Sequence, residues 1–178
     1  VCGKAGKDAK FIEALAVVKP AEDPISVLSR AASPAEKLAA LESLHSSLPF
    51  ALQARRTKGL EALRRVAISG IEAPVVRARA LLYLGYCVPV VGDESTRSAA
   101  VLSLLDMTAA PDYRVFALRG LAPASHDLPA AVEERFQTTL LDLLDQKLSN
   151  EEQITALVAL DAFVRSRDDM PQSRPDLV

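Results

Sequence analysis

Residues 74–84 read Pro-Val-Val-Arg-Ala-Arg-Ala-Leu-Leu-Tyr-Leu, and this stretch decides the fold. Its frame, Pro-x-x-Arg-x-x-Ala-Leu-x-x-Leu, recurs along the chain at a spacing of 37 to 40 residues. The four copies begin at Pro34, Pro74, Pro111 and, in a weaker form, Asn150. Self-similarity at a fixed spacing of this length is typical of a repeat array, in which each repeat is one supersecondary unit.

Each copy of the frame predicts a helix that begins at its first residue. Proline is tolerated at the first helical position because its missing N–H would have no partner there. The Ala, Leu and Leu of the frame have the spacing of one helical face, so we expect Leu81 and Leu118 in the core. A helix pair of this size cannot bury its own apolar face, and neighbouring repeats must therefore stack.

The frame resembles the first helix of a HEAT repeat, and the resemblance covers roughly residues 33–165. The residues that carry it best are Pro74, Val76, Arg77, Ala80, Leu81, Leu84 and Gly85. The resemblance implies an α-solenoid and says little about activity. It also implies that the frame's arginine, at Arg77 and Arg114, pairs with an acid of a neighbouring repeat, although only Asp112 stands at a suitable place. Contact with a ligand is the other interpretation of these arginines.

We expect an all-α fold, a HEAT-like solenoid of stacked antiparallel helix pairs with about eight or nine helices. The solenoid would span residues 8–167, with capping helices in 8–32, including one at 8–19, and repeats in 33–167. In each repeat the frame helix is followed by a second helix, so the fourth repeat, which ends near Asp168, is half a repeat. Residues 1–7 and 168–178 are expected to be a mobile segment and a flexible tail.

Amino-acid composition and net charge limit the classes of molecule that could bind this protein. Apolar residues make up 49% of the 178, aromatic residues only 4%, and the net charge is −2 with a pI of about 5.8. An acidic chain without tryptophan argues against nucleic acid as the partner. The charge is uneven, because residues 50–92 hold seven basic residues against two acids. A polarised surface of this kind can orient a charged partner, although ordinary solvated helix faces also explain it.

No catalytic, cofactor-binding or metal motif stands out in the sequence. The chain has two histidines, and Ser125, His126 and Asp127 are consecutive, which does not let three side chains converge as a triad requires. The two cysteines, Cys2 and Cys87, fit no zinc or Cys-x-x-Cys spacing. We therefore expect a protein that is not an enzyme and uses no cofactor.

Cys2 leaves the location of the protein open. It resembles the lipid-modified cysteine of bacterial lipoproteins, which would place the chain in the cell envelope; the alternative is a cytoplasmic protein. Pairing between Cys2 and Cys87 is a further possibility. No run of 18 apolar residues predicts a membrane span.

The expected function is a protein-binding scaffold or adaptor that acts through the surface of the array, with a partner that could be acidic. The alternatives are a HEAT-like nucleic-acid-binding or chromophore-processing enzyme and an envelope lipoprotein scaffold. Three features are candidate partner contacts: an arginine-rich second helix, an apolar loop at 86–92, and an apolar edge of the last helix. Their residues are Arg55, Arg56, Arg64, Arg65, Val88, Val90, Val91 and Phe163, to which Arg77 and Arg114 of the frame are added.

Overall fold

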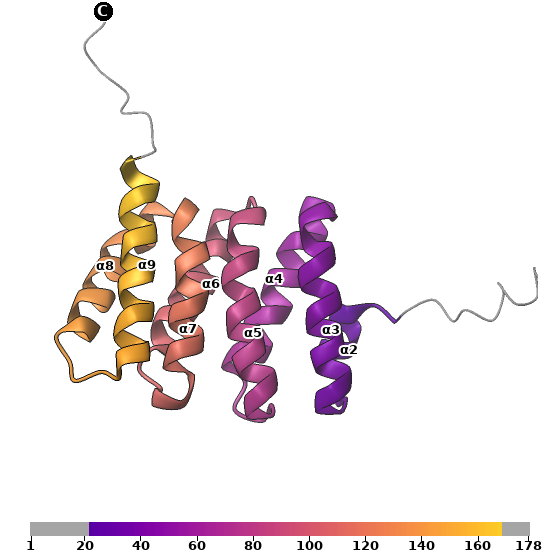
Figure 1. The fold of residues 1–178 in the computed structure, drawn as a ribbon. Coiled ribbons are helices and arrows are strands. Elements are labelled where there is room, and N and C mark those ends of the chain that lie inside the picture. Colours follow the sequence, from indigo (N-terminus) through magenta and orange to yellow (C-terminus); the bar gives the residue numbers. More distant parts are fainter. Residues whose placement is uncertain (1–21, 169–178) are drawn as a thin grey trace, which may run out of the picture.

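A computed structural model of the chain describes residues 22–168, and these form helices joined by short connections, with no strand among them. The helices lie in two layers (Figure 1). The four helices that begin with the repeat frame, here called the frame helices, form the front layer, and four others lie behind them. The frame helices are α3 (Pro34–Ser47), α5 (Pro74–Cys87), α7 (Pro111–Ala124) and α9 (Asn150–Asp168). The rear helices are α2 (Pro24–Ser29), α4 (Gln53–Ile68), α6 (Glu94–Met107) and α8 (Ala130–Leu144).

The helices begin where the sequence predicts. The Ser33 side chain accepts from the Glu36 N–H and the Glu36 carboxylate accepts from the Ser33 N–H, which completes a capping box at the start of α3. Ser149 and Glu152 repeat this arrangement at α9. The expected helix at 8–19 and the tail from Asp169 lie outside the described residues.

Short 3-10 turns follow three of the frame helices, at Leu48–Phe50, Val88–Val90 and Ser125–Asp127. The sequence predicts that the third frame helix ends at Leu121, but α7 continues to Ala124 with Pro123 in its last turn. Proline is disfavoured in a helix interior because it lacks an N–H and its ring crowds the preceding turn. In the last turn the helix does not have to continue past it.

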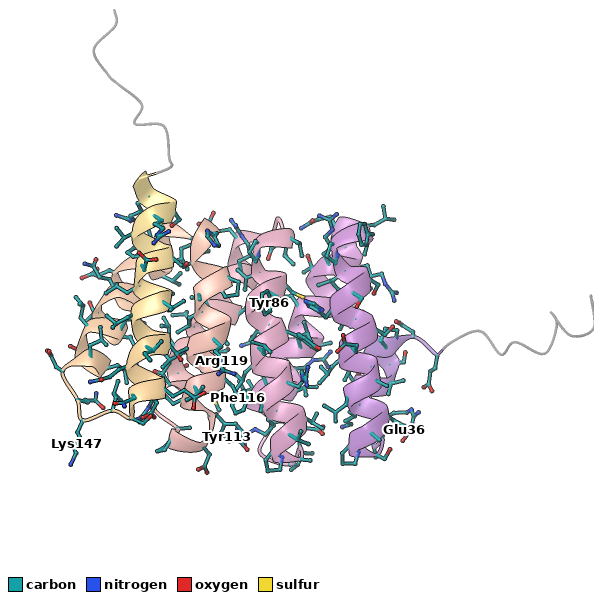
Figure 2. All side chains as sticks on the ribbon, in the orientation of Figure 1. Glu36, Tyr86, Tyr113, Phe116, Arg119 and Lys147 are labelled. Atoms are coloured by element: carbon teal, nitrogen blue, oxygen red, sulfur yellow. The ribbon has the colours of Figure 1, made fainter. Side chains whose placement is uncertain are left out.

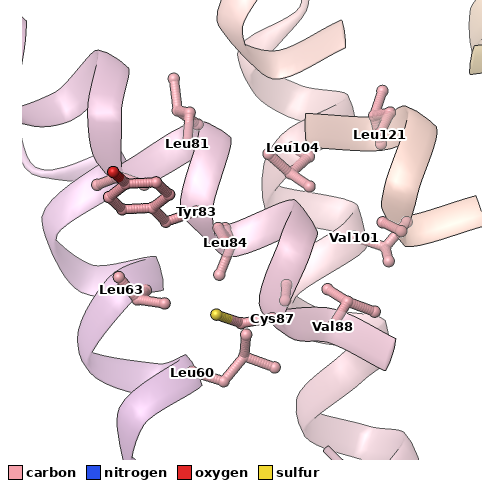
Figure 3. Close-up of a cluster of buried hydrophobic side chains, with 14 of the residues drawn as sticks. Leu60, Leu63, Leu81, Tyr83, Leu84, Cys87, Val88, Val101, Leu104 and Leu121 are labelled. Carbon is pink, nitrogen blue, oxygen red and sulfur yellow. The ribbon is translucent and has the colours of Figure 1, made fainter. Parts of the chain in front are cut away.

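The apolar residues of the frame form the core. Leu81 and Leu118 are completely buried, as predicted, and so are their counterparts Leu41, Leu44, Leu84 and Leu121. Figure 3 shows how Leu60 and Leu63 of α4 and Leu104 of α6 meet the frame residues of α5 and α7. The side chains of both layers therefore share one continuous core.

The pairing of helices differs from the sequence-based expectation. Among the rear helices, each frame helix packs most closely on the one that precedes it, so the units are α2–α3, α4–α5, α6–α7 and α8–α9. Within residues 22–168 no second helix follows α9, and the rear helix on which it packs is α8. The recurring frame indicates which helices are equivalent in the array, but it does not predict on which neighbouring helix each of them packs.

The last frame helix is rotated relative to the frame. Ala156 is buried as in the other copies, but Leu157 is 53% exposed, and Thr155, Ala159 and Phe163 face inward instead. Helices α3, α5 and α7 each have a later frame helix beside them, whereas α9 is the last frame helix of the described chain. One side of α9 therefore carries apolar residues that no described helix covers. Within residues 22–168, no helix has both the length and the apolar character to span a membrane.

Candidate functional site

The outward face of the frame helices changes character along the array. In α3 the outward positions carry small or polar residues, such as Ala35, Glu42 and Ser46. The equivalent positions of α5 are Val75, Leu82 and Tyr86. Val75 is 55% exposed and Tyr86 is 52% exposed, and Ile154 on the outward face of α9 is 63% exposed. Single exposed apolar residues are ordinary, but contiguous exposed apolar surface is typical of interaction sites.

Two neighbouring hollows on this face, which share two lining residues, form what we call the α5–α7–α9 groove. The first has a volume of about 600 Å³ and lies between α5 and α7. The second, of about 440 Å³, continues it between α5, α7 and α9, and both are lined by Leu82 and Arg119. The first is lined by Pro74, Val75, Ala78, Arg79, Leu82, Asp112, Tyr113, Phe116 and Arg119. The second adds Tyr86, Ala122, Pro123, Ile154, Thr155 and Val158.

The groove follows the seam between α5 and α7. In Figure 2, Tyr113, Phe116 and Arg119 follow one another up this seam, and Tyr86 lies at its upper end. Val75 and Tyr86 are eleven residues apart on α5. At a rise of 1.5 Å per residue, the groove is about 16 Å long. It is therefore long enough to accommodate a short segment of a polypeptide.

Tyr113 is held in the wall of the groove by Arg77. The Arg77 guanidinium lies 4.2 Å from the centre of the Tyr113 ring, and its Nη1 donates to the Tyr113 hydroxyl over 3.1 Å. Arg77 also donates to the carbonyl of Ala67, at the end of α4. This bonding fixes the ring before any ligand arrives, which lowers the entropy cost of binding.

Arg79 is anchored to the rest of the chain through a tyrosine. Its Nη1 donates over 3.1 Å to the hydroxyl of Tyr83, which in turn donates to the carboxylate of Glu42. The imidazole of His45 stacks on Tyr83 with 4.3 Å between ring centres. Burial, together with the hydrogen bond to Glu42, raises the pKa of Tyr83, so its hydroxyl stays protonated at neutral pH. The relay ties the Arg79 guanidinium to α3, and the Arg79 side chain is also part of the lining of the first hollow.

Arg119 lies where the two hollows meet. Its Nη2 donates to Glu151 at the start of α9 over 2.8 Å, and both side chains are more than half exposed. Exposed ion pairs of this kind contribute about 0–1 kcal/mol, so a competing carboxylate can replace Glu151. The groove thus combines an apolar floor with two arginines, Arg79 and Arg119, while Asp112 lies near one end.

Comparison with known proteins gives no relative. No protein-family model matches the chain, and neither a curated protein nor a solved structure matches it. The repeat frame and the groove are therefore the features from which a function can be inferred.

The four arginines of α4 do not form one patch. Successive helical residues differ by about 100°, so Arg55, Arg56, Arg64 and Arg65 point to different sides of the helix. Arg55 pairs with Asp23 over 2.8 Å, and Arg64 reaches the Ser103 hydroxyl over 3.4 Å. Arg56 donates to the carbonyls of Pro49, Ala51 and Val90, and thereby ties two loops together. Arg65 is exposed, and the four arginines of this helix therefore do not gather on one surface.

The basic residues of the frame connect neighbouring repeats. Arg114 pairs with Glu152 over 3.0 Å, and Lys37 pairs with Glu72; all four side chains are largely buried. The predicted ladder is therefore present at these two positions, with acids that do not occupy equivalent places in the repeat. Arg77 contacts Tyr113 where the sequence suggested Asp112. Among the frame cations, only Arg77 borders the groove, and it does so through the Tyr113 ring.

Two other candidate contacts belong to the core. Val88 and Val91 of the apolar loop are buried and Val90 is half-buried against the core, so this loop packs over the edge of the array. Phe163 is only 5% exposed and lies 5.2 Å from Phe136 between ring centres. Its assignment to an exposed edge is wrong; the exposed apolar residues of α9 are Ile154, Leu157, Val158 and Val164.

Cys87 is a buried free thiol, and burial raises its pKa to about 12. Its possible partner Cys2, which is also the candidate lipid anchor, lies outside the described residues. Among residues 22–168, no group of three or more His, Cys, Asp or Glu side chains could hold a metal ion.

Sequence analysis missed the groove, although a signal for it exists. Leu82 and Tyr86 follow Val75 at i+7 and i+11, a spacing that places all three on one helical face. This face differs from the helix face that carries the recurring Ala, Leu and Leu of the frame. A second apolar face on a helix whose first face already fills the core indicates either further packing or a binding surface.

Proposed function

We propose that this chain is a non-enzymatic, HEAT-like repeat module that binds a segment of a partner protein in the α5–α7–α9 groove. The observation that carries the proposal is the change of the outward face from small and polar residues on α3 to apolar residues on α5, beside which α7 and α9 complete a mostly apolar groove. Solvent alone favours polar residues at such positions, since exposing apolar surface to water is unfavourable. A bound partner would cover this surface.

The repeat architecture supports a scaffold role. Stacked repeats present extended surfaces without needing a catalytic centre. The four copies of the frame, and the burial of its leucines in the first three, support the assignment to the HEAT-like class. The paired residues Arg114 and Glu152, and Lys37 and Glu72, hold successive repeats in a fixed relation, which keeps the groove preformed.

The size and chemistry of the groove favour a polypeptide. Its floor is mostly apolar, and Tyr86, Tyr113, Phe116 and two arginines border it. Tyrosine and arginine are enriched among residues that dominate the energy of protein interfaces. The first hollow lies between α5 and α7 and the second also reaches α9, so a segment that fills both would contact three consecutive repeats.

A selection with counter-selection tests the proposal. A displayed peptide library would be selected on the wild-type chain and depleted on the double variant Val75→Glu and Ile154→Glu. Both residues are more than half exposed, so these changes block the groove while leaving the core intact. The matched control is Leu141→Glu, a 45% exposed leucine on α8 of the rear layer.

We expect peptides that bind the wild-type chain and the Leu141→Glu control with equal affinity and lose at least tenfold in affinity to the double variant. Circular dichroism would verify that all three proteins melt alike. Peptides that bind all three proteins equally, or a selection that yields none, would contradict docking in the groove.

A further inference from the structure

We infer that the partner segment is an amphipathic α-helix whose flank carries carboxylates, bound with its apolar stripe on the groove floor and its acids at Arg79 and Arg119. The inference rests on the proposed docking function of the same groove and names the chemistry of what docks there. Three features of the described chain lead to it: the length of the groove, the state of its aromatic walls and the placement of its charges.

The length and breadth of the groove match a helix. About 16 Å corresponds to three helical turns, over which an amphipathic helix presents apolar residues at i, i+4 and i+7. Two neighbouring hollows of about 600 and 440 Å³ offer room for several such side chains. A helix lying there would cover Val75 in the first hollow and Leu82, which lines both hollows.

Other modes of peptide recognition fit the groove less well. Addition of a strand needs an open sheet edge, and residues 22–168 contain no strand. A proline-rich segment docks between exposed aromatic rings. Here the Arg77 guanidinium lies over the Tyr113 ring at 4.2 Å and covers one of its faces. That face of the Tyr113 ring is therefore not available to a proline of a partner.

The arginines of the groove favour a bound helix that carries acidic residues on its flank. Arg79 and Arg119 both lie on its lining, at the middle of the path between Val75 and Tyr86. Arg79 uses Nη1 to bind Tyr83, and a guanidinium has five N–H donors, so further donors can serve a carboxylate. The Tyr83–Glu42 relay holds this arginine in place beforehand, which reduces the ordering cost of binding.

The second arginine can change partners. Arg119 is bound to Glu151 in the free chain, and this pair is exposed on both sides. Because an exposed pair contributes little, a partner carboxylate brought close by the apolar contacts can take the place of Glu151. Arg119 lines both hollows, so an acid on the partner could reach it from either one.

The test uses the peptide selected on the wild-type chain. We expect its sequence to show apolar residues at i, i+4 and i+7 with Asp or Glu beside them. Fluorescence anisotropy would measure its Kd for wild-type protein and for Arg79→Gln, Arg119→Gln and Arg65→Gln. Arg65 is exposed on α4 of the rear layer and serves as the matched control.

We expect Arg79→Gln and Arg119→Gln each to raise the Kd about threefold to fivefold, as the loss of an exposed charge pair should, and Arg65→Gln to leave it unchanged. A peptide with Gln in place of its acids should bind wild-type protein more weakly and be insensitive to both substitutions. The affinity of the acidic peptide should also fall as salt is added.

Two kinds of contrary result can be distinguished: one against an acidic helix as the occupant, and one against docking in the groove itself. Selected peptides that need Val75 and Ile154 but are proline-rich, or that bind as well with Gln in place of their acids, would overturn the acidic helix and leave docking in the groove intact. Peptides that do not depend on Val75 and Ile154 at all would overturn both.

Discussion

Gly85 and Gly120 bring the backbones of α5 and α7 into contact. A Cβ atom on Gly85 would lie 1.9 Å from the carbonyl oxygen of Gly120, and one on Gly120 would lie 2.7 Å from the carbonyl oxygen of Leu81. No side chain can fit at either position unless a backbone moves. The two helices that form the groove are therefore set against each other by a pair of glycines, one at the end of each frame.

The glycine contact predicts a loss of stability on substitution. Gly85→Ala should lower the free energy of unfolding by about 2–3 kcal/mol, because the added methyl group forces apart two packed backbones. Gly70→Ala is the control, since a Cβ there meets nothing within 4 Å and no described glycine has a positive φ. Urea unfolding monitored by circular dichroism measures both. Equal stability of the two variants would show that α5 and α7 do not touch as described.

The capping boxes predict a dependence of stability on pH. Hydrogen bonds from Ser33 lower the pKa of Glu36, and those from Ser149 lower the pKa of Glu152, from an ordinary value of 4.5. A carboxyl group with a lowered folded-state pKa stabilises the fold fully above its unfolded value and loses that contribution as the pH falls through the folded value.

We therefore expect the free energy of unfolding to be constant above about pH 5 and to fall below it. Ser33→Ala and Ser149→Ala together should make this decline shallower, since the pKa values of the two glutamates return toward 4.5. Unfolding curves measured across this range test it. A decline that is just as steep in the double variant would contradict the role of the capping boxes.

Substitutions at two neighbouring residues of α9 should differ sharply in their effect on the free energy of unfolding. Phe163 is buried against Phe136, and Phe163→Ala should cost about 3–5 kcal/mol. Val164 is half exposed, so Val164→Ala should change the free energy of unfolding by about 0.5 kcal/mol or less. Chemical denaturation of both variants distinguishes them, and similar losses at 163 and 164 would mean that α9 is rotated differently.

Cys87 should be unreactive in the folded protein. Burial raises its pKa to about 12, and the thiolate is the reactive form. In a Cys2→Ser background, a thiol reagent at pH 8 should label Cys87 only as fast as the chain unfolds, and completely once guanidinium chloride is added. Rapid labelling without denaturant would place this thiol at the surface.

The repeat frame was enough to predict the frame helices, their starting residues and, in the first three copies, their buried leucines. A proline, a capping serine and a face of Ala, Leu and Leu are local signals, and local geometry follows from them. Leu81 and Leu118 occupy the positions that this pattern predicts.

The helix partners and the site depend on relations between distant residues. The frame cannot tell whether α5 packs on α4 or α6, and it cannot tell that Phe163 and Leu157 exchange inward and outward positions at the end of the array. The groove is built from the outward faces of three helices, and only their stacking brings Leu82, Phe116 and Ile154 to one surface. Arginines that the sequence alone does not distinguish have different hydrogen-bond partners in the structure, as the contact of Arg56 with the carbonyl of Val90 shows.

Methyl-resolved NMR of the wild-type chain, titrated with the peptide selected on it, tests the central claim most directly. If the α5–α7–α9 groove is the docking site, the methyl signals of Val75, Leu82 and Ile154 should shift together, while that of Leu141 on α8 stays in place. Shifts concentrated on Leu141 and other methyl groups of α4, α6 and α8, with Val75, Leu82 and Ile154 unchanged, would place the binding surface on the rear layer and contradict the account.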